Sequence, residues 1–433
     1  MTHETSFWHP YADMGAVRTS ELVIDRAEDV WVWDTEGTRY LDATAAQWYV
    51  NVGHGRPEIR AAVAAQMEQV AGSSAFFDLA NRPALELSEA LAQRAPMPSK
   101  VFLTSGGSEG IETAAKLARR YWWEMGQPDR TVLISRTAGY HGTHGMGTAL
   151  GGIPANREGF GHLMGTVQVR HDSLRDLEET VDRLGADRIA AVFVEPVIGA
   201  GGVYPPARGY LEGVARLCER TGALLVADSV ICAFGRLGTW FGVERWNLEP
   251  SMIVFAKGVT SGYLPLGGVM VSERIAEPFW GEPGTTMFRH GCTYSGHPTC
   301  CAAALANIEL LERDGLLERG REQEQALFDA LAPLADDELV AEVRGGVGTM
   351  AAVELTREAR ERYAGAVSTV WKGAREAGVM VRPGASAVAV SPPLTAGHEH
   401  FQLIAEAIEH GLRCCERTSS RQPDAGTLVR PAA

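Results

Sequence analysis

Three polar segments placed at the ends of apolar runs could carry chemistry. Lys257 follows the run SMIVFA, Asp228 follows ALLVA, and the segment Ser105-Gly106-Gly107-Ser108 lies between a strand-like run and a helix-like one. An apolar flank desolvates a lysine, which lowers its pKa and makes the neutral amine nucleophilic. A glycine-rich turn at a helix N-terminus presents backbone N–H groups to an anion. The three segments together could therefore hold an anionic ligand that reacts with an amine.

Each of these residues also has an ordinary structural interpretation. A lysine at a strand end is most often a solvated surface residue, Asp228 could cap a turn, and Ser108 could be an N-cap. Taken jointly, an amine for an aldehyde, an anion for a protonated ring nitrogen and a cradle for a phosphate describe pyridoxal 5'-phosphate (PLP). The period-two alternation of a strand places Asp228 and Val230 on one face and Ser229 on the other.

The elements that must position these residues alternate between strands and helices. The continuous apolar runs AAVFV, ALLVA and MIVFA predict strands covered on both faces, and the intervening helical segments predict right-handed parallel crossovers. In such a sheet, ligands bind beyond the carboxyl ends of the strands. This edge would carry Ser105–Ser108, Glu195, Asp228 and Lys257.

The pattern predicts an α/β protein with two domains. We expect a large, doubly wound, mostly parallel domain over residues 66–315 and a smaller α+β domain built from residues 1–65 and 316–433. Residues 21–42 alternate like short antiparallel strands, which would belong to the small domain. The polar stretch 416–433 is expected to be a disordered tail.

Composition bounds the class of protein. The chain has 433 residues, 45% of them hydrophobic and 22% charged, which excludes a disordered, collagen-like or coiled-coil protein. The net charge of −14 argues against nucleic-acid binding. We expect no secretory signal and no transmembrane helix. Seven cysteines, an odd number without CxxC spacing, indicate neither a disulfide framework nor a zinc motif. A cytoplasmic location fits best.

Longer motifs carry a resemblance to a known family, the class III (ω-) aminotransferases of the fold type I PLP-dependent enzymes. The segments that resemble it run from WHPYADM to SPPL: SGGSEGIETAAKLAR, GYHG, EPVIGAGGVYPP, GALLVADSVICAFGRLGTWFG, FAKGVTSGYLPLGG and HGCTYSGHP. The sequences of these motifs most resemble those of the ω-amino acid:pyruvate and amine:pyruvate transaminases. The resemblance implies the cofactor PLP and transfer of an amino group from an amine or ω-amino acid to a keto acid such as pyruvate.

The resemblance also implies roles for individual residues. Lys257 resembles the catalytic Schiff-base lysine, and Asp228 the partner of the pyridine nitrogen. Trp48 resembles an aromatic residue of the substrate pocket, and Arg382 an arginine, here expected on a flexible loop, that pairs with the substrate carboxylate. The other cofactor-binding positions that it implies are Ser105, Gly106, Gly107, Ser108, Tyr140, His141, Glu195, Val230 and Thr293.

The family's partners are also implied. Thr293 resembles a phosphate ligand supplied by the neighbouring subunit, so we expect a homodimer that acts on small molecules, without nucleic acid or membrane. The spacing of His141 and His144 offers no metal site, because no carboxylate or thiolate stands at ligand spacing. The motifs leave open the amine donor, the keto acid, the pathway, the stereochemistry and the choice between dimer and tetramer.

The main departure from the family pattern is at Ser229, and two alternative functions remain open. Ser229 stands where the family usually has glutamate, which removes a carboxylate next to Asp228. The same cofactor also serves an aminomutase, decarboxylase, racemase or lyase of this family, and the strand-end residues do not separate these reactions. The second alternative is an inactive PLP-binding partner protein, against which the complete set of Lys257, Asp228 and Arg382 argues.

Overall fold

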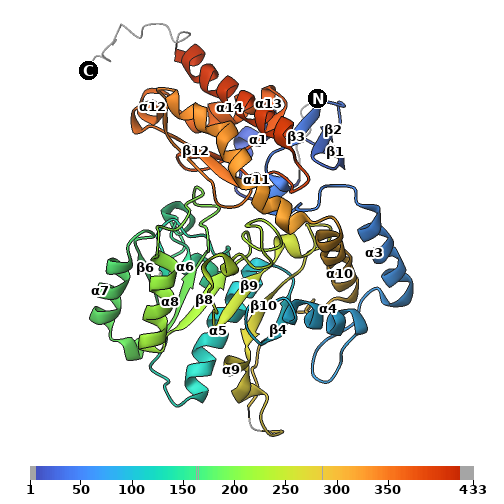
Figure 1. The fold of residues 1–433 in the computed structure, drawn as a ribbon, viewed down its shortest axis with the longest axis vertical. Coiled ribbons are helices and arrows are strands. Elements are labelled where there is room, and N and C mark those ends of the chain that lie inside the picture. Colours follow the sequence, from blue (N-terminus) through green and yellow to red (C-terminus); the bar gives the residue numbers. More distant parts are fainter. Residues whose placement is uncertain (1–5, 162, 164, 285, 420–433) are drawn as a thin grey trace, which may run out of the picture.

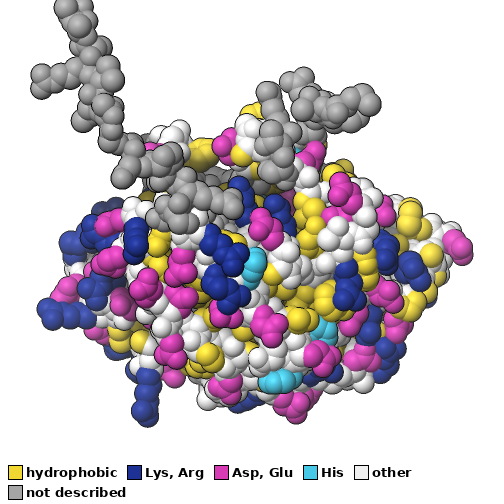
Figure 2. All heavy atoms as spheres, turned by 90° about the horizontal axis from the view of Figure 1, so that it is seen from above, with side chains coloured by type: hydrophobic (Ala, Val, Ile, Leu, Met, Phe, Trp, Pro, Cys, Tyr) yellow, Lys and Arg dark blue, Asp and Glu magenta, His cyan; other side chains and the backbone are white. Residues whose placement is uncertain are grey.

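The computed structural model describes residues 6–419 except 162, 164 and 285. Figure 1 shows a larger body around a central sheet, and above it a smaller body in which the N-terminal strands lie beside the C-terminal helices. Among the described residues, no helix is both long and apolar enough to cross a membrane. Figure 2 shows positive and negative side chains interspersed over the face that is seen from above the smaller body.

The larger body is built on a seven-stranded sheet. Its strand order is β4 (Ser99–Thr104), β10 (Gly267–Ser272), β9 (Met252–Phe255), β8 (Leu224–Asp228), β7 (Ile189–Val194), β5 (Val132–Arg136) and β6 (Thr166–Val169). The pairs from β9 to β6 are parallel, and only β10 runs antiparallel to both of its neighbours. Every residue of β7, β8 and β9 is buried, as their continuous apolar runs predict.

Helices cover both faces of this sheet, because alternate strand residues belong to different cores. Phe193, Val226 and Val254 pack with α5 (Gly107–Glu124). Their neighbours on the opposite face pack in a second core with α7 (Leu174–Leu184), α8 (Tyr210–Thr221), α4 (Arg82–Ala92) and α10 (Pro298–Arg313), and α3 (Pro57–Val70) packs beside α10. The prediction of a doubly wound, mostly parallel α/β fold is confirmed.

The smaller body combines both ends of the chain in two four-stranded sheets. The first has the order β1 (Ile24–Glu28), β2 (Trp31–Asp34), β3 (Arg39–Asp42) and β13 (Val379–Met380). The second has the order β11 (Val340–Arg344), β12 (Ala351–Leu355), β15 (Ala387–Val390) and β14 (Arg382–Pro383). Because β13 pairs in parallel with β3, the N-terminal and C-terminal segments share one sheet.

Helices α12 (Arg357–Arg362), α13 (Ala366–Glu376) and α14 (His398–Ser419) lie in the upper part of the smaller body (Figure 1). Helix α11 (Leu316–Leu331) lies between the two bodies and contacts α14 of the smaller body and α10 of the larger one. Helix α14 extends to Ser419, a few residues beyond the position of about 416 where the disordered tail was expected to begin. The rest of that expected tail, residues 420–433, lies outside the described residues.

Short helices and turns complete the described chain. They are α1 (Met14–Ser20), α2 (Ala45–Trp48), α6 (Gly145–Leu150), α9 (Glu273–Ala276), η1 (Pro154–Asn156), η2 (Ala186–Arg188), η3 (Val243–Trp246), η4 (Lys257–Val259), η5 (Glu277–Phe279) and η6 (Ala332–Asp336). Two of them, α2 and η4, supply site residues. Both contain residues with positive φ, which marks backbone held in a sparsely populated conformation.

Candidate active site

Asp228 is the last residue of β8, and its carboxylate is held from two directions. Its Oδ2 lies 2.8 Å from Nδ1 of His141, and its Oδ1 accepts a hydrogen bond of 3.1 Å from the Val230 N–H. Asp228 and His141 are 4% and 2% exposed. With its proton on Nδ1, the imidazole donates to the carboxylate, which stabilises the ionised form and fixes its orientation.

Glu195 follows β7 and joins two loops. Its Oε1 accepts from the Tyr140 N–H and its Oε2 from the Gly199 N–H, both at 3.0 Å. Burial raises the pKa of this carboxyl, and the nearby Asp228 raises it further, whereas His141 acts in the opposite direction. Glu195 therefore positions the Tyr140 loop against the strand ends.

Lys257 lies two residues beyond the end of β9, and its ammonium interacts electrostatically with Asp228 and Glu195. Burial lowers the pKa of its ammonium to about 8, and Arg382 lowers it further, while Asp228 and Glu195 oppose the shift. The lysine has a φ of +50°, a conformation that a non-glycine residue adopts at a cost of order 1–3 kcal/mol. Trp48 has a φ of +69°, so two of the predicted site residues carry backbone strain.

The predicted phosphate cradle forms the start of α5. The helix begins at Gly107, and its N-cap is Gly106, so the alternative role of Ser108 as the N-cap does not hold. Ser105 Oγ is buried and has no hydrogen-bond partner among the described residues. A Cβ at Gly107 would lie 2.9 Å from Cγ1 of Val230, so this turn packs directly against the residue that follows Asp228.

Arg382 and Trp48 lie together. The Arg382 guanidinium carbon lies 5.7 Å from the centre of the Trp48 ring, and its Nη1 donates to the Ala200 carbonyl at 3.2 Å. The expectation that Arg382 lies on a flexible loop is wrong: it begins β14, where it pairs with Ala389 of β15. The short segment VMVRPG lacks the length from which strand pairing could be inferred.

Tyr140 has a neighbour that the sequence did not indicate. Its hydroxyl forms a hydrogen bond with Tyr11, and burial raises its pKa well above the usual range. Tyr11 belongs to the segment WHPYADM, which resembles the family, but no role was predicted for this residue. Arg136 was also missed, and this buried side chain donates to the carbonyl oxygen of Glu195. Its only sequence signal is its place at the end of β5.

Thr293 forms no hydrogen bond with these site residues within the described part of the chain, although its neighbour Cys292 bonds Glu109 in the first turn of α5. Thr293 lies in an exposed turn between residues 291 and 297, in the segment that precedes α10.

Ser229 is fully buried, and its Oγ has no hydrogen-bond partner within the described part of the chain. Its N–H donates to the Val254 carbonyl at 2.9 Å, which continues the pairing of β8 with β9 one residue beyond Asp228.

The donor set fits PLP. Ser105 Oγ, which has no partner among the described residues, and the backbone N–H groups at the start of α5 are donors suited to a phosphate. Asp228 is an oriented carboxylate suited to a protonated ring nitrogen, and Lys257 is an amine whose pKa of about 8 leaves a neutral fraction at ordinary pH. The Val230 N–H donates to Asp228, and the Tyr140 N–H donates to Glu195, so both loops are bonded to carboxylates at the strand ends.

Comparison with known proteins agrees with this chemistry. Residues 13–412 match the family model for class-III aminotransferases. A putrescine–pyruvate aminotransferase of Pseudomonas aeruginosa is 36% identical, over 92% of this chain and 91% of its own. An (S)-enantioselective ω-transaminase of Thermomicrobium roseum superposes with a TM-score of 0.90 at 39% identity, covering 94% of this chain and 96% of its own.

The cofactor is also present in a similar solved structure. An amine transaminase from an uncultivated Pseudomonas species, in its PLP-bound form, has a TM-score of 0.91 and 37% identity, over 96% of this chain and all of its own. The family match spans most of the chain, and the residues that PLP requires lie together at the strand ends. The chain therefore belongs to the class-III aminotransferases and is a PLP-dependent transaminase.

Proposed function

We propose that this transaminase moves an amino group from an amine or ω-amino acid to a keto acid, with pyruvate as the acceptor. The observation that carries the acceptor class is Arg382. Its guanidinium is partly buried beside Trp48, and among the described residues no carboxylate pairs with it. The names of the similar proteins, a putrescine–pyruvate aminotransferase and an ω-transaminase, support the donor and acceptor classes.

We assign the proton transfers to Lys257. PLP supplies an aldehyde that bonds to amines and a ring that accepts the electrons released when a C–H bond breaks. Lys257 Nζ, neutral in part because burial lowers its pKa to about 8, accepts a proton from the substrate carbon and would return it to the cofactor carbon that carries the aldehyde. Asp228, fixed by His141, holds a proton on the ring nitrogen.

Arg382 and Trp48 select the substrate. A carboxylate would form a bidentate, charge-assisted pair with the guanidinium in place of the single bond to the Ala200 carbonyl. An amine without a carboxylate leaves that bond intact, and the buried ring of Trp48, 2% exposed, supports the guanidinium from behind. One pocket thus serves both half-reactions.

We also propose that the active protein is a cytoplasmic homodimer in which Thr293 of the partner subunit completes the phosphate site. Exposed apolar side chains near the Thr293 turn support an interface. Phe77 is 97% exposed, and Phe76 and Leu85 line a cavity of about 340 Å³ together with His290 and Ser295. Since all seven cysteines are thiols, the chain fits a reducing compartment.

A donor and acceptor panel tests the function. The holoenzyme is mixed with putrescine, β-alanine or an aromatic amine, each with pyruvate, 2-oxoglutarate or oxaloacetate, and alanine, glutamate and aspartate are measured. We expect alanine to form with pyruvate. A single turnover with donor alone should release one carbonyl product per site. Carbon dioxide release, or racemised donor without carbonyl product, would contradict transamination.

Analytical ultracentrifugation tests whether the protein is a dimer. A monomer that retains full activity would contradict the shared site.

A further inference from the structure

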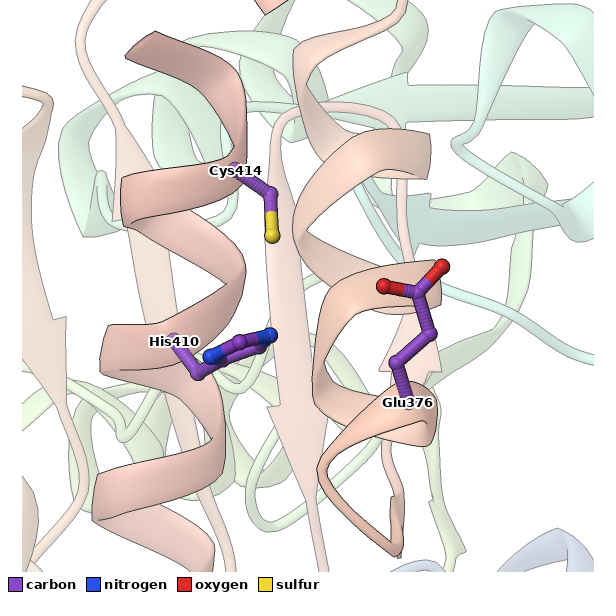
Figure 3. Close-up of side chains that lie close together, drawn as sticks. All are labelled: Glu376, His410 and Cys414. Carbon is purple, nitrogen blue, oxygen red and sulfur yellow. The ribbon is translucent and has the colours of Figure 1, made fainter. Parts of the chain in front are cut away.

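Three side chains of different ligand chemistry meet on the smaller body, away from the strand ends. Glu376 is the last residue of α13, while His410 and Cys414 are four residues apart on α14. Figure 3 shows His410 and Cys414 pointing from one helix toward the other, on which the Glu376 carboxylate lies with one oxygen turned toward them. One ligand atom from each lies within 4.8 Å of the other two.

The spacing of these side chains is fixed by the backbone. Residues four apart in a helix lie on one face, one turn above the other, so His410 and Cys414 are held in register. The two helices touch at a pair of glycines: a Cβ at Gly373 would lie 2.7 Å from the Gly411 Cα and 3.3 Å from the Cys414 sulfur. The crossing therefore sets the distance from α13 to the His410–Cys414 face.

The neighbouring charges leave the carboxylate and the imidazole available. Within the described part of the chain, no salt bridge or side-chain hydrogen bond occupies Glu376 or His410. Arg413 is engaged with Glu409 at 2.7 Å, and the Arg375 guanidinium lies over the Trp371 ring at 5.1 Å. Glu376 is exposed, while His410 and Cys414 are half-buried, so a solvated ion can reach all three.

We propose that Glu376, His410 and Cys414 form a Zn²⁺ site that clips α13 to α14. A thiolate, an imidazole and a carboxylate form a mixed set that suits zinc and does not suit Mg²⁺ or Ca²⁺, which take oxygen ligands. The bond lengths of tetrahedral zinc place S and N ligands about 3.6 Å apart and N and O ligands about 3.3 Å apart. Side-chain rotation alone closes the remaining distance from 4.8 Å or less.

Zinc binding at this site would release one proton and would leave one coordination position for water. Cys414 releases its proton to solvent as the Zn–S bond forms, and water fills the fourth position, because three protein ligands leave it open. Since Glu376 ends α13 and the chain then enters β13 and β14, the clip would fasten the segment that leads to Arg382. Catalysis itself does not require the metal.

Co²⁺ and Zn²⁺ titrations of the holoenzyme, freed of excess PLP, test the site. We expect one Co²⁺ per chain, with visible d–d bands of tetrahedral cobalt and displacement by one equivalent of Zn²⁺. Cys414→Ser, His410→Gln and Glu376→Gln should each weaken binding about tenfold or more. In peptide mapping, Zn²⁺ should also protect Cys414 from alkylation by iodoacetamide.

A matched control separates this site from adventitious binding. His398→Gln removes an exposed histidine from the first turn of the same helix and should leave the titration unchanged. Unaltered Co²⁺ spectra in both Cys414→Ser and His410→Gln would overturn the proposal, as would octahedral spectra or the absence of stoichiometric binding at metal concentrations several-fold above that of the protein. Because the three side chains lie at a surface, the transaminase rate measured without metal reports that each variant is folded.

Discussion

The side chains of His141 and Asp228, 87 residues apart in the sequence, lie 2.8 Å apart and are both buried. The imidazole is hydrogen-bonded to Oδ2 of the carboxylate, and the Val230 N–H donates to Oδ1. A buried carboxylate with both oxygens held has little freedom to rotate. We therefore propose that His141 is a positioning residue that would act through Asp228 on the ring nitrogen of PLP.

Replacing His141 with alanine should weaken cofactor binding. A hydrogen bond to a charged group contributes about 1.5–3 kcal/mol, so the dissociation constant of PLP should rise by about ten- to a hundredfold. Equilibrium dialysis of PLP and the circular dichroism of the bound cofactor measure the effect. His144→Ala is the control, since His144 is exposed three residues along. Equal losses in both variants would show that only the loop was disturbed.

Lys257→Ala should bind PLP without a covalent bond and should lose turnover. The substitution removes the amine that both attaches the cofactor and carries the proton. Borohydride reduction followed by peptide mapping should label Lys257 in the wild-type protein and no residue in the variant. A labelled lysine elsewhere in the wild type would disprove the assignment, and external methylamine should partly restore the proton transfer.

The rate at which the apoprotein attaches PLP should depend on pH. Burial lowers the pKa of Lys257 to about 8, and only the neutral amine attacks an aldehyde. Below that pH the neutral fraction falls about tenfold per unit, so the rate should rise as pH increases and level off above about 8. Stopped-flow absorbance measures it. A plateau reached only near the pKa of a solvated lysine would contradict burial of the amine.

Gly107 and Gly106 should respond differently to alanine. A Cβ at Gly107 meets Val230 Cγ1 at 2.9 Å, whereas a Cβ at Gly106 has nothing within 4 Å. Overpacking costs about 1–3 kcal/mol, which displaces Val230 and the turn that precedes α5. Gly107→Ala should therefore lower PLP affinity about five- to a hundredfold, and Gly106→Ala much less. Similar affinities for the two variants would show that this contact does not shape the cradle.

Much of the fold could be predicted because burial on both faces leaves a continuous apolar signal. The strands that end at Val194, Asp228 and Phe255 were visible for that reason, and their ends indicated the edge that carries Glu195 and Lys257. The reversed direction of β10 was not visible. Strand direction depends on the path of the chain between strands, which local apolar pattern does not record.

The site was predicted less completely, because its contacts join distant segments. The bonds of His141 to Asp228 and of Arg382 to Ala200 span 87 and 182 residues, and no spacing rule covers such distances. The prediction of a loop around Arg382 was wrong for a related reason. A two-residue strand is stabilised by pairing with its partner β15, and its own sequence gives little signal.

The strand position of Arg382 sharpens the last prediction. Because its backbone is paired with β15, the proposed selection between substrates would rest on rotation of the side chain, which would exchange the Ala200 carbonyl for a substrate carboxylate. A charge-assisted pair contributes about 1.5–3 kcal/mol, so Arg382→Ala should raise the KM for pyruvate by about ten- to a hundredfold.

In Arg382→Ala, the half-reaction with an amine that lacks a carboxylate should change much less. In the wild-type protein such an amine does not bind the guanidinium, which stays bonded to the Ala200 carbonyl. Single-turnover rates of each half-reaction, measured over a range of substrate concentrations, separate the two effects. Arg382→Lys retains the charge but not the bidentate geometry, and it should recover only part of the pyruvate affinity. Equal losses in both half-reactions would assign Arg382 a structural role at Trp48, whereas an unchanged KM for pyruvate would assign the carboxylate to another residue.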